Sequence, residues 1–322
     1  MTRRTRTAPR RRKGAHGTVK PTTVRASAIA EFLKAELRGP DVEIRSPRGL
    51  DDIEPHSLLF LHRANPQGTA RINAVPGVMT IVSASASAAI AGTHVVVPNA
   101  RLAFARAVTH FFGSALSRAK IAKTAIIGRN VTLGRDVSVG EYCVIEDDAR
   151  IGDRTRIGHH VVIAEGSVIG KDCVIMSHCV IGEQGFGFIH DEDKVPLRFP
   201  HVGRTELGDR VEIGNFNAIP RAALEKTSIG DDTKTGDFVQ IPHNARVGRY
   251  CLLAAYAKVG SGAVVGDHVF MGVRSSTREN VRVGEWAMIG QGAVVLQDVP
   301  ERAVMAGVPA KYLRDRKDEG GF

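Results

Sequence analysis

Apolar residues recur at every sixth position along more than half of this chain. The first run is unbroken over residues 127–181, and the second covers residues 229–295, where only Thr235 and Thr277 are not apolar. In the first run a small or β-branched residue usually follows each apolar residue by four positions. A period of six fits neither the helical repeat nor the alternation of a single strand. It is typical of a parallel β-helix, in which three short strands form each triangular coil.

Two interruptions of this period predict loops. The register is lost between Ile181 and Leu207, and the step from Ile219 to Ile229 is ten residues instead of six. A regular coil has no room for inserted residues in its core, so both insertions are expected to leave the β-helix as external loops. Loops carried on a rigid scaffold are where binding and catalytic residues concentrate.

Residues 21–118 lack this period and show mixed helical and strand patterns. An amphipathic helical pattern comes first, and short β-like runs separated by Pro, Gly and Asn follow it. Strands and helices at this spacing predict a small α/β domain. The expected elements are helices over 23–37 and 101–112 and strands over 57–61, 78–82 and 94–97.

Charge is concentrated at the start of the chain. The 322 residues carry a formal net charge of +10, but eight basic and no acidic side chains fall within residues 1–20. Such a segment cannot bury enough apolar surface to fold, so we expect a disordered basic arm over 1–20. A solvated tail with no nucleic-acid partner is the expectation, and an arm that touches nucleic acid, anionic lipid or an acidic partner is the alternative. No apolar run reaches transmembrane length and no secretory apolar segment follows the arginines, so the expected location is the cytoplasm.

The cysteines and histidines show no metal pattern. Each cysteine occupies the small-residue position of a hexapeptide, which predicts packing residues rather than disulfides or metal ligands. The short-range histidine pairing of a zinc site is missing between His243 and His268, so no metal is expected. The four cysteines are Cys143, Cys173, Cys179 and Cys251.

A histidine in a cleft can remove a proton from an attacking amine or hydroxyl, because its pKa lies near neutrality. His243 stands out, because Pro242 follows the inward-facing Ile241 and acidic residues are close in the chain. From spacing alone, a surface imidazole at a turn remains the alternative. The candidates within the repeats are His159, His160, His178, His243 and His268.

Several stretches resemble one family. Residues 181–188, 201–214 and 239–248 are similar to the UDP-3-O-(3-hydroxyacyl)glucosamine N-acyltransferases of lipid A biosynthesis. That family has an insertion of the same length as the ten-residue step from Ile219 to Ile229. Upstream, residues 60–66 resemble that family's uridine-binding loop, and residues 95–106 resemble the end of its N-terminal domain.

The resemblance implies a mainly β protein and a specific chemistry. We expect a left-handed parallel β-helix over 119–300, preceded by the small α/β domain of 21–118 and followed by a short tail over 301–322. The family's homotrimer places active sites between subunits. His243 would be the general base for the amine of a nucleotide-linked amino sugar, which attacks the thioester of an acyl-phosphopantetheine on acyl carrier protein or CoA. A backbone N–H near Gly260–Ser261 would meet the oxyanion, and no bound cofactor is implied.

The same resemblance implies substrate-binding residues in both domains. Phe60 would stack on the nucleotide base and Asn65 would make a polar contact, while Gln184, Phe186 and Gly187 would border the acceptor or acyl site. Phe60 has an alternative role as a core residue of its strand. The loop residues have an alternative role as a tight glycine turn.

The chain departs from the family pattern at its site. Gly236 replaces an acidic residue seven positions before the base, so Asp237 or the Asp231–Asp232 pair would have to orient the imidazole. Asn280 stands in place of a second cleft histidine, and Gln67–Gly68 in place of an aromatic residue of the uridine loop.

The end of the repeat region adds a further difference. A tail of about a dozen residues replaces the family's helical extension, and Ala306–Lys311 resembles the end of CoA-dependent sugar acetyltransferases. Two alternatives to the family's function therefore stay open. One is an acetyl-CoA-dependent nucleotide-sugar N-acetyltransferase, and the other is a non-catalytic β-helix scaffold.

Overall fold

The computed structural model describes residues 23–63, 65–113 and 120–315, and it divides the chain into the units Met1–Ser117 and Arg118–Phe322. Each unit has its own apolar core. The predicted basic arm lies outside the described residues. In the described parts of the chain, no helix has both the length and the apolar character needed to cross a bilayer.

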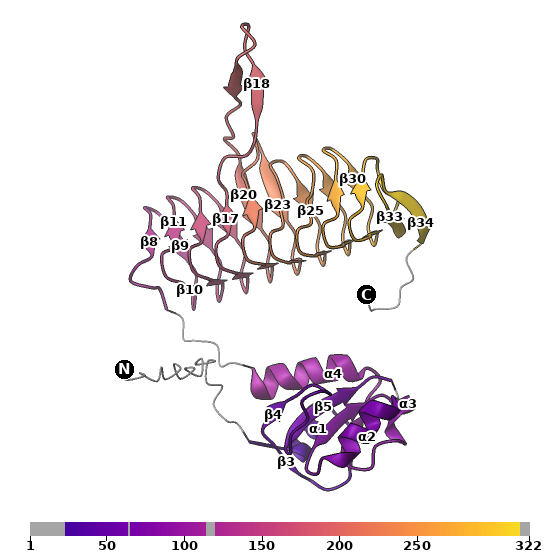
Figure 1. Ribbon diagram of the computed structural model, residues 1–322. Coiled ribbons are helices and arrows are strands. Elements are labelled where there is room, and N and C mark those ends of the chain that lie inside the picture. The colour runs from indigo at the N-terminus through magenta and orange to yellow at the C-terminus, as the bar shows by residue number, and fades with distance from the viewer. Residues whose placement is uncertain (1–22, 64, 114–119, 316–322) are drawn as a thin grey trace, which may run out of the picture. The chain divides into compact units, whose positions relative to one another are not determined.

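The N-terminal unit is built on a five-stranded sheet in the order β2-β7-β6-β5-β4, drawn in indigo and violet in Figure 1. Strands β4 to β7 are parallel, and β2 runs antiparallel to β7. The sheet strands are β2 (Leu37–Arg38), β4 (Ser46–Pro47), β5 (Ser57–Leu61), β6 (Met79–Val82) and β7 (Thr93–Val96), and β1 (Val24–Arg25) pairs separately with β3 (Glu43–Ile44).

Helices cover both faces of this sheet because its central strands are apolar on both sides. Leu58 and Leu59 are adjacent in β5 and fully buried, yet they belong to different apolar clusters. One cluster includes residues of α1 and α4, and the other includes residues of α2 and α3. The helices are α1 (Ala26–Phe32), α2 (Pro66–Ala74), α3 (Ala84–Ser87), α4 (Ala100–Ala107) and the π-helix η1 (Val108–Phe112).

The three strands expected in this unit are confirmed within one residue at each end, whereas the first helix is shorter than expected. Helix α1 ends at Phe32 because Lys34 takes a left-handed conformation with φ of 53°, and Leu37 already belongs to β2. The second expected helix is present as α4, continued by the π-helical turn η1.

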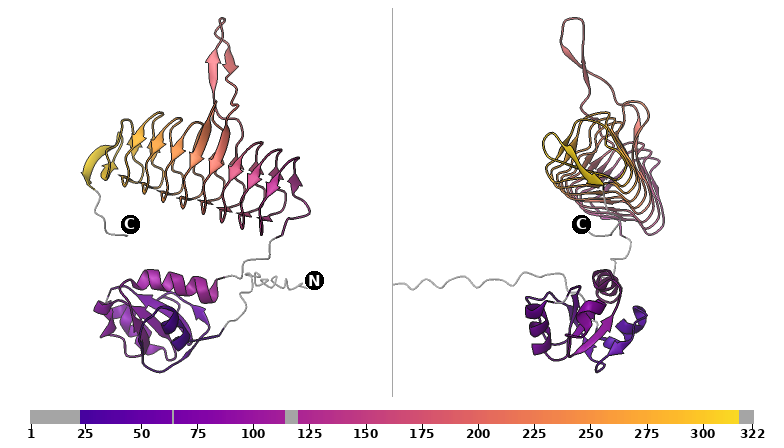
Figure 2. Two further views of the ribbon diagram at one scale, coloured as in Figure 1. Left: turned by 180° about the vertical axis from the view of Figure 1, so that it is seen from behind. Right: turned by 90° about the vertical axis from the view of Figure 1, so that its right-hand side faces the viewer.

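The second unit is a parallel β-helix, as the period of six predicts. Val144 pairs in parallel with Ile126 on one side and Val162 on the other, so each regular coil advances the chain by 18 residues. The coils stack into three faces, which Figure 2 shows end-on and from behind.

The first face contains β10 (Ser138–Val139), β13 (Arg156–Ile157), β16 (Val174–Ile175), β21 (Glu212–Ile213), β24 (Lys234–Thr235), β26 (Leu252–Leu253), β28 (Phe270–Met271), β31 (Met288–Ile289), β33 (Ala303–Ala306) and β34 (Lys311–Asp315). The second face contains β8 (Ile126–Ile127), β11 (Val144–Ile145), β14 (Val162–Ile163), β17 (Val180–Ile181) and β22 (Ala218–Ile219). It continues through bridges at Gln240 and Lys258 to β29 (Ser276–Thr277) and β32 (Val294–Val295). The third face contains β9 (Thr132–Leu133), β12 (Arg150–Ile151), β15 (Val168–Ile169), β20 (Arg204–Leu207), β23 (Lys226–Ile229), β25 (Arg246–Val247), β27 (Val264–Val265) and β30 (Arg282–Val283).

The interior is a continuous aliphatic column, since the second residue of most strands points inward. The cysteines fill the positions expected of packing residues: all four are fully buried and none is paired. Burial raises the pKa of the Cys173, Cys179 and Cys251 thiols to about 11. Thr235 fits into this apolar column because its hydroxyl donates to Asn217 Oδ1 at 3.0 Å.

Rings stack along the corner between the first and second faces, which we call the ring corner. The centres of successive rings are 4.8 to 5.2 Å apart, and the planes of the rings are almost parallel. The ring corner consists of Tyr142, His160, His178, Phe216, Phe238 and Tyr256.

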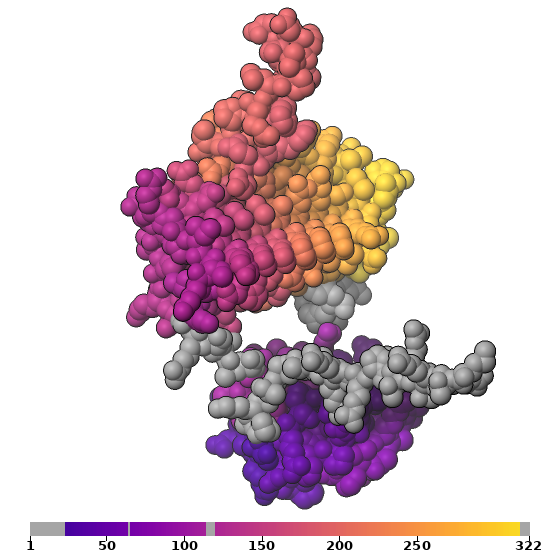
Figure 3. Space-filling view, turned by 60° about the vertical axis from the view of Figure 1, so that its left-hand side comes forward, coloured from indigo at the N-terminus to yellow at the C-terminus, as the bar shows by residue number. Residues whose placement is uncertain are grey.

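Both predicted loops leave the coil between the second and third faces, which we call the loop corner. The longer one carries an antiparallel hairpin of β18 (Phe188–His190) and β19 (Pro196–Arg198) that projects far from the β-helix (Figures 1 and 3). The shorter one connects β22 to β23. The expectation of external loops is confirmed.

The described part of the predicted tail contains strands. Residues 303–306 form one more strand parallel to β31, and β34 folds back on it as an antiparallel partner. The first face therefore continues past Val295, the last apolar hexapeptide position, since β33 and β34 add two more strands to its edge.

Candidate functional site

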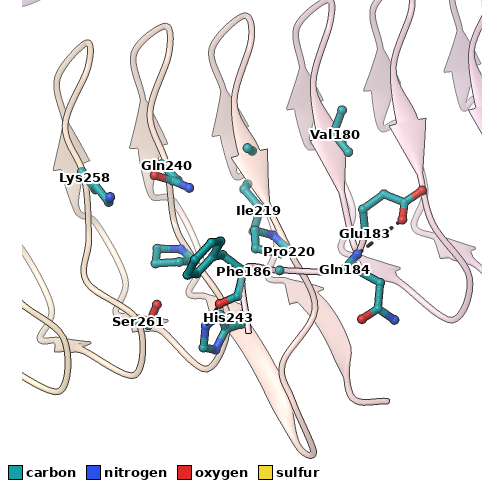
Figure 4. Close-up of a pocket in the computed structure, with 13 residues that line it drawn as sticks. Val180, Glu183, Gln184, Phe186, Ile219, Pro220, Gln240, His243, Lys258 and Ser261 are labelled. Atoms are coloured by element: carbon teal, nitrogen blue, oxygen red, sulfur yellow. Dashed lines mark hydrogen bonds between the residues drawn. The ribbon is translucent and has the colours of Figure 1, made fainter. Parts of the chain in front are cut away.

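A cavity of about 450 Å³ opens at the loop corner, beside His243 (Figure 4). One wall is the outer surface of the second face, and another is the start of the long loop. The cavity is lined by Val180, Ala218, Ile219, Pro220, Gln240 and Lys258, by the loop residues Glu183, Gln184, Gly185 and Phe186, and by Pro242, His243 and Ser261.

The His243 ring is held by the loop. Its Nε2 lies 3.1 Å from the Phe186 carbonyl oxygen. A carbonyl oxygen can only accept, so in this conformation Nε2 carries the proton and Nδ1 has the lone pair. Nδ1 is buried and has no hydrogen-bond partner among the described residues. The nitrogen closest to the loop is therefore the donor here, and a base at Nε2 requires this contact to open.

A second imidazole, His201, packs against the first. The ring centres of His201 and His243 are 4.7 Å apart with an interplanar angle of 76°. His201 is 1% exposed, and its Nδ1 donates to the Phe199 carbonyl at 3.1 Å. Its Nε2 is buried and without a hydrogen-bond partner in the described part of the chain. Burial, and then the neighbouring His243, lower the pKa of His201, which favours the neutral ring.

The sequence pattern does not predict His201 as a site residue. The residue lies 42 positions before His243 and outside the hexapeptide period, so neither spacing nor repeat position connects the two. Its only signal is its place at the start of the stretch 201–214, where the resemblance resumes after the hairpin.

Gln184 and Gly187, both predicted as site residues, hold the loop against these imidazoles. Gln184 bonds the His201 backbone twice: its Oε1 accepts from the His201 N–H and its Nε2 donates to the His201 carbonyl, each at 3.0 Å. A Cβ on Gly187 would lie 2.5 Å from His201 Cε1, and one on Gly185 would lie 3.0 Å from His243 Cδ2. Only residues without a Cβ permit this close approach.

Phe186, also predicted, contributes through its backbone and its ring separately. The carbonyl contacts His243, while the ring is 84% exposed and borders the cavity. An exposed ring at a cavity mouth is available to a ligand with an apolar chain.

Ser261 follows one coil after His243 and lines the same cavity. The Gly260 N–H is occupied by Thr277 Oγ1 at 2.9 Å, whereas the Ser261 N–H has no acceptor among the described residues. At the same position of an earlier coil, the Arg129 N–H is capped by Asp147 Oδ1 at 2.7 Å. The Ser261 N–H is therefore a free backbone donor near the candidate base.

Within this chain Asp237 does not contact His243, and its role in orienting the imidazole stays a prediction. Its Oδ1 accepts from the Asn215 backbone N–H at 2.7 Å and from the Asn215 side chain at 3.1 Å. Six residues span one face of the coil, so Asp237 lies at a different corner. Asp231 and Asp232 are also engaged elsewhere, with the Asp209 N–H and the Arg210 guanidinium.

The two predicted nucleotide contacts lie in the N-terminal unit and have structural roles there. Phe60 packs on Phe104 with ring centres 4.8 Å apart, at the margin of the core. Asn65 caps α2, where its Oδ1 accepts from the Gly68 N–H at 3.1 Å. Their contact with a nucleotide stays a prediction. Within the described residues, no group of three or more His, Cys, Asp or Glu is placed to hold a metal ion.

Comparison with known proteins assigns the repeats to a recognised type. Residues 115–221 match the GMPPB C-terminal domain, and residues 226–261 match the bacterial transferase hexapeptide of six repeats. The chain is 36% identical to UDP-3-O-acylglucosamine N-acyltransferase of Caulobacter sp. (strain K31) over 134 residues, which are 42% of this chain and 39% of the relative. It is 34% identical to probable UDP-3-O-acylglucosamine N-acyltransferase 2, mitochondrial, of Arabidopsis thaliana over 130 residues, 40% of this chain and 43% of the relative. The chain thus spans about two fifths of the length of these relatives.

Solved structures agree on the fold. LpxA from Acinetobacter baumannii matches with a TM-score of 0.55 and 27% identity, over 61% of this chain and 74% of that one. UDP-N-acetylglucosamine O-acyltransferase (LpxA) from Moraxella catarrhalis RH4 matches with a TM-score of 0.56 and 26% identity, over 62% and 75%. The resemblance found in the sequence is confirmed. The chain is a hexapeptide-repeat protein in which a small α/β region precedes a left-handed parallel β-helix along the sequence, and it is related in sequence to the UDP-3-O-acylglucosamine N-acyltransferases.

Proposed function

We propose that this protein is an N-acyltransferase that moves an acyl group from a phosphopantetheine thioester to the amine of a nucleotide-linked amino sugar. The observation that carries the proposal is the cavity that holds both the His243 imidazole and the free Ser261 N–H. A base beside an unoccupied backbone donor is the arrangement that acyl transfer requires. The sequence relationship to N-acyltransferases points to the same chemistry.

The reaction follows from these two groups. The substrate amine displaces the Phe186 carbonyl from His243 Nε2, and the proton of the neutral ring then resides on Nδ1. As the amine nitrogen attacks the thioester carbon, Nε2 takes the amine proton and the Ser261 N–H donates to the oxyanion. Collapse of this intermediate forms the amide and breaks the carbon–sulfur bond. The leaving thiolate takes the proton back from His243 and departs as the thiol.

The rest of the cavity suits a polar, anionic acceptor. Gln240 and Lys258 project from the second face on the side of the cavity away from the loop (Figure 4). A lysine in this position attracts the diphosphate of a nucleotide sugar. The exposed Phe186 ring would border the acyl chain. We further infer a homotrimer, because a neighbouring copy placed along the second face would supply the wall that a single chain does not.

A mass-spectrometric acylation assay tests this function. One arm offers UDP-3-O-acylglucosamine with 3-hydroxyacyl carrier protein, and the other offers nucleotide amino sugars with acetyl-CoA. Product from the first arm, lost in His243→Ala and kept in the hairpin control His190→Ala, supports the lipid A role. Product only from the second arm supports the acetyltransferase alternative. Absence of product in both, without nucleotide binding, supports the scaffold alternative.

A further inference from the structure

Two buried nitrogen atoms without partners belong to contacting imidazole rings at the loop corner. His243 Nδ1 and His201 Nε2 are both inaccessible and have no hydrogen-bond partner among the described residues. Buried polar atoms of side chains normally have at least one partner, so two exceptions in contacting rings require an explanation.

The proposed reaction, on which this inference rests, creates a need at one of these atoms. When His243 accepts the amine proton on Nε2, both of its ring nitrogens carry hydrogen, and Nδ1–H becomes a buried donor. Asp237 lies at another corner, bonded to Asn215, and Asp232 pairs with Arg210. Glu183 lines the cavity, where its carboxylate accepts from the Gln184 N–H at 3.3 Å. A buried imidazolium with an unpaired N–H is strongly disfavoured, so an efficient base requires an acceptor here.

We propose that His201 is the positioning residue of His243, and that its Nε2 accepts a hydrogen bond from His243 Nδ1–H when His243 is protonated. The spacing suits this bond, because an N–H···N contact of about 2.9 Å places two imidazole centres roughly 5 Å apart. The observed separation is 4.7 Å, and the rings are perpendicular. Rotation of one ring is therefore sufficient, without movement of the backbone.

His243 is the ring that turns, because His201 is fixed at three points. Its Nδ1–H is bonded to Phe199, and its backbone N–H and carbonyl are both bonded to Gln184. Rotation of His243 releases Nε2 from the Phe186 carbonyl, and the proposed reaction needs that release as well. A single rotation thus exposes the base and brings Nδ1 to its acceptor.

His201 can accept only while its own Nε2 is unprotonated. Burial and the neighbouring His243 lower the pKa of His201, in keeping with a neutral ring. The other charged groups that face the pair are Arg198, which contacts the Gly185 carbonyl at 3.3 Å, and Glu183 and Lys258 in the cavity. His201 thus takes the place of the orienting carboxylate, with a neutral acceptor instead of a charged one.

Two variants of His201 separate hydrogen bonding from packing. His201→Phe keeps a flat ring but removes the acceptor, and His201→Gln keeps an acceptor. We expect His201→Phe to lower kcat about tenfold or more with little change in KM, since the lost interaction stabilises the protonated His243 that forms in the reaction and not the bound substrate. The acidic limb of its pH profile should move to lower pH, because the protonated His243 ring loses the acceptor that stabilises it. His201→Gln should retain most of the activity, and the acidic limb of its pH profile should stay at the wild-type position.

Nitrogen NMR titration of His243 in the substrate-free protein gives an independent answer. A lower pKa of His243 in His201→Phe, restored toward the wild-type value in His201→Gln, supports the pairing even if no acyl transfer is found. An identical titration in both variants and the wild type overturns it, even if the wild type is an active acyltransferase.

Thermal melts establish that both variants are folded. Should His201→Phe fail to fold, the wild-type spectrum decides. When His243 is protonated, the His201 Nε2 signal must show an unprotonated, hydrogen-bonded nitrogen, and a signal without such a bond overturns the proposal.

Discussion

The ring corner and the loop corner belong to the same β-helix and differ in how completely their groups are satisfied. At the ring corner six rings stack face to face, so each covers its neighbours. At the loop corner His243 Nδ1, His201 Nε2 and the Ser261 N–H lack partners among the described residues.

The difference follows from where the repeat is interrupted. A regular coil places like residues above one another, which lets rings stack and lets Asp147 cap the Arg129 N–H of the preceding coil. The inserted loop brings its own residues against His243, and these residues have no equivalents in the neighbouring coils to stack on. In this molecule the repeat provides rigidity, and the insertion provides groups that are available for chemistry.

The largest expected effect comes from adding one methyl group at the loop corner. In Gly187→Ala the new Cβ would lie 2.5 Å from His201 Cε1, and the buried His201 ring has no space to withdraw. Displacement of the two imidazoles by about 1 Å should lower kcat/KM about a hundredfold. The acylation assay measures this. Gly49→Ala is the control, since its Cβ would meet nothing within 4 Å, and equal activity in both variants would contradict the close fit.

At the ring corner, removal of one ring should lower stability and leave activity unchanged. Phe216→Ala removes stacking on both His178 and Phe238, whose ring centres lie 4.8 and 4.9 Å away. Two such contacts contribute about 1–3 kcal/mol to the free energy of unfolding. Tyr142→Ala, at the end of the stack, removes one contact and should cost about half as much. Urea unfolding measures both, and equal losses would show that stacking is not the cause.

The capped carboxylates predict how stability depends on pH. The Arg129 backbone N–H, and then its guanidinium, lower the pKa of Asp147, and the Arg135 backbone N–H and guanidinium do the same for Asp153. The folded state therefore binds these protons less readily than the unfolded state. The two carboxylates therefore add to the free energy of unfolding above a pH of about 4, and this contribution is lost as the pH falls through their lowered pKa values in the folded state.

Urea midpoints between pH 7 and pH 2 test this dependence. Asp147→Asn should reduce the midpoint at pH 7 and show a shallower decline toward acid than the wild type. Glu192→Gln, at the tip of the hairpin, serves as the charge control and should follow the wild-type curve. A parallel decline in Asp147→Asn and the wild type would show that the cap contributes nothing.

The smallest effect is expected from alkylation of the cysteines. Burial raises the pKa of Cys173, Cys179 and Cys251 to about 11, and only the thiolate reacts rapidly. Iodoacetamide at pH 8 should therefore leave the folded protein unmodified and its activity intact, whereas all four cysteines should react in urea. Mass spectrometry counts the adducts, and rapid labelling of the folded protein would show that the interior opens.

Local pattern was sufficient for the scaffold. The period of six predicts the β-helix, the inward position of Ile163 and Ile175, the burial of the cysteines and the two external loops. It succeeds because each coil makes the same contacts with its neighbours, so every position repeats the same physical demand. The strands of the N-terminal unit follow from their apolar runs in the same way, whereas α1 ends earlier than its helical pattern because Leu37 joins the sheet.

The sequence also pointed to His243 as the candidate base and to the loop residues around it, Gln184, Phe186 and Gly187. It did not point to the residue that packs against His243 in this chain. Asp237 is near His243 in the chain and lies at another corner, because six residues cross one whole face. His201 is distant in the chain and in contact with His243, because the hairpin returns to the corner from which it left. Proximity along a chain is a poor guide where loops fold back, so the tertiary structure alone decided which groups surround the candidate base.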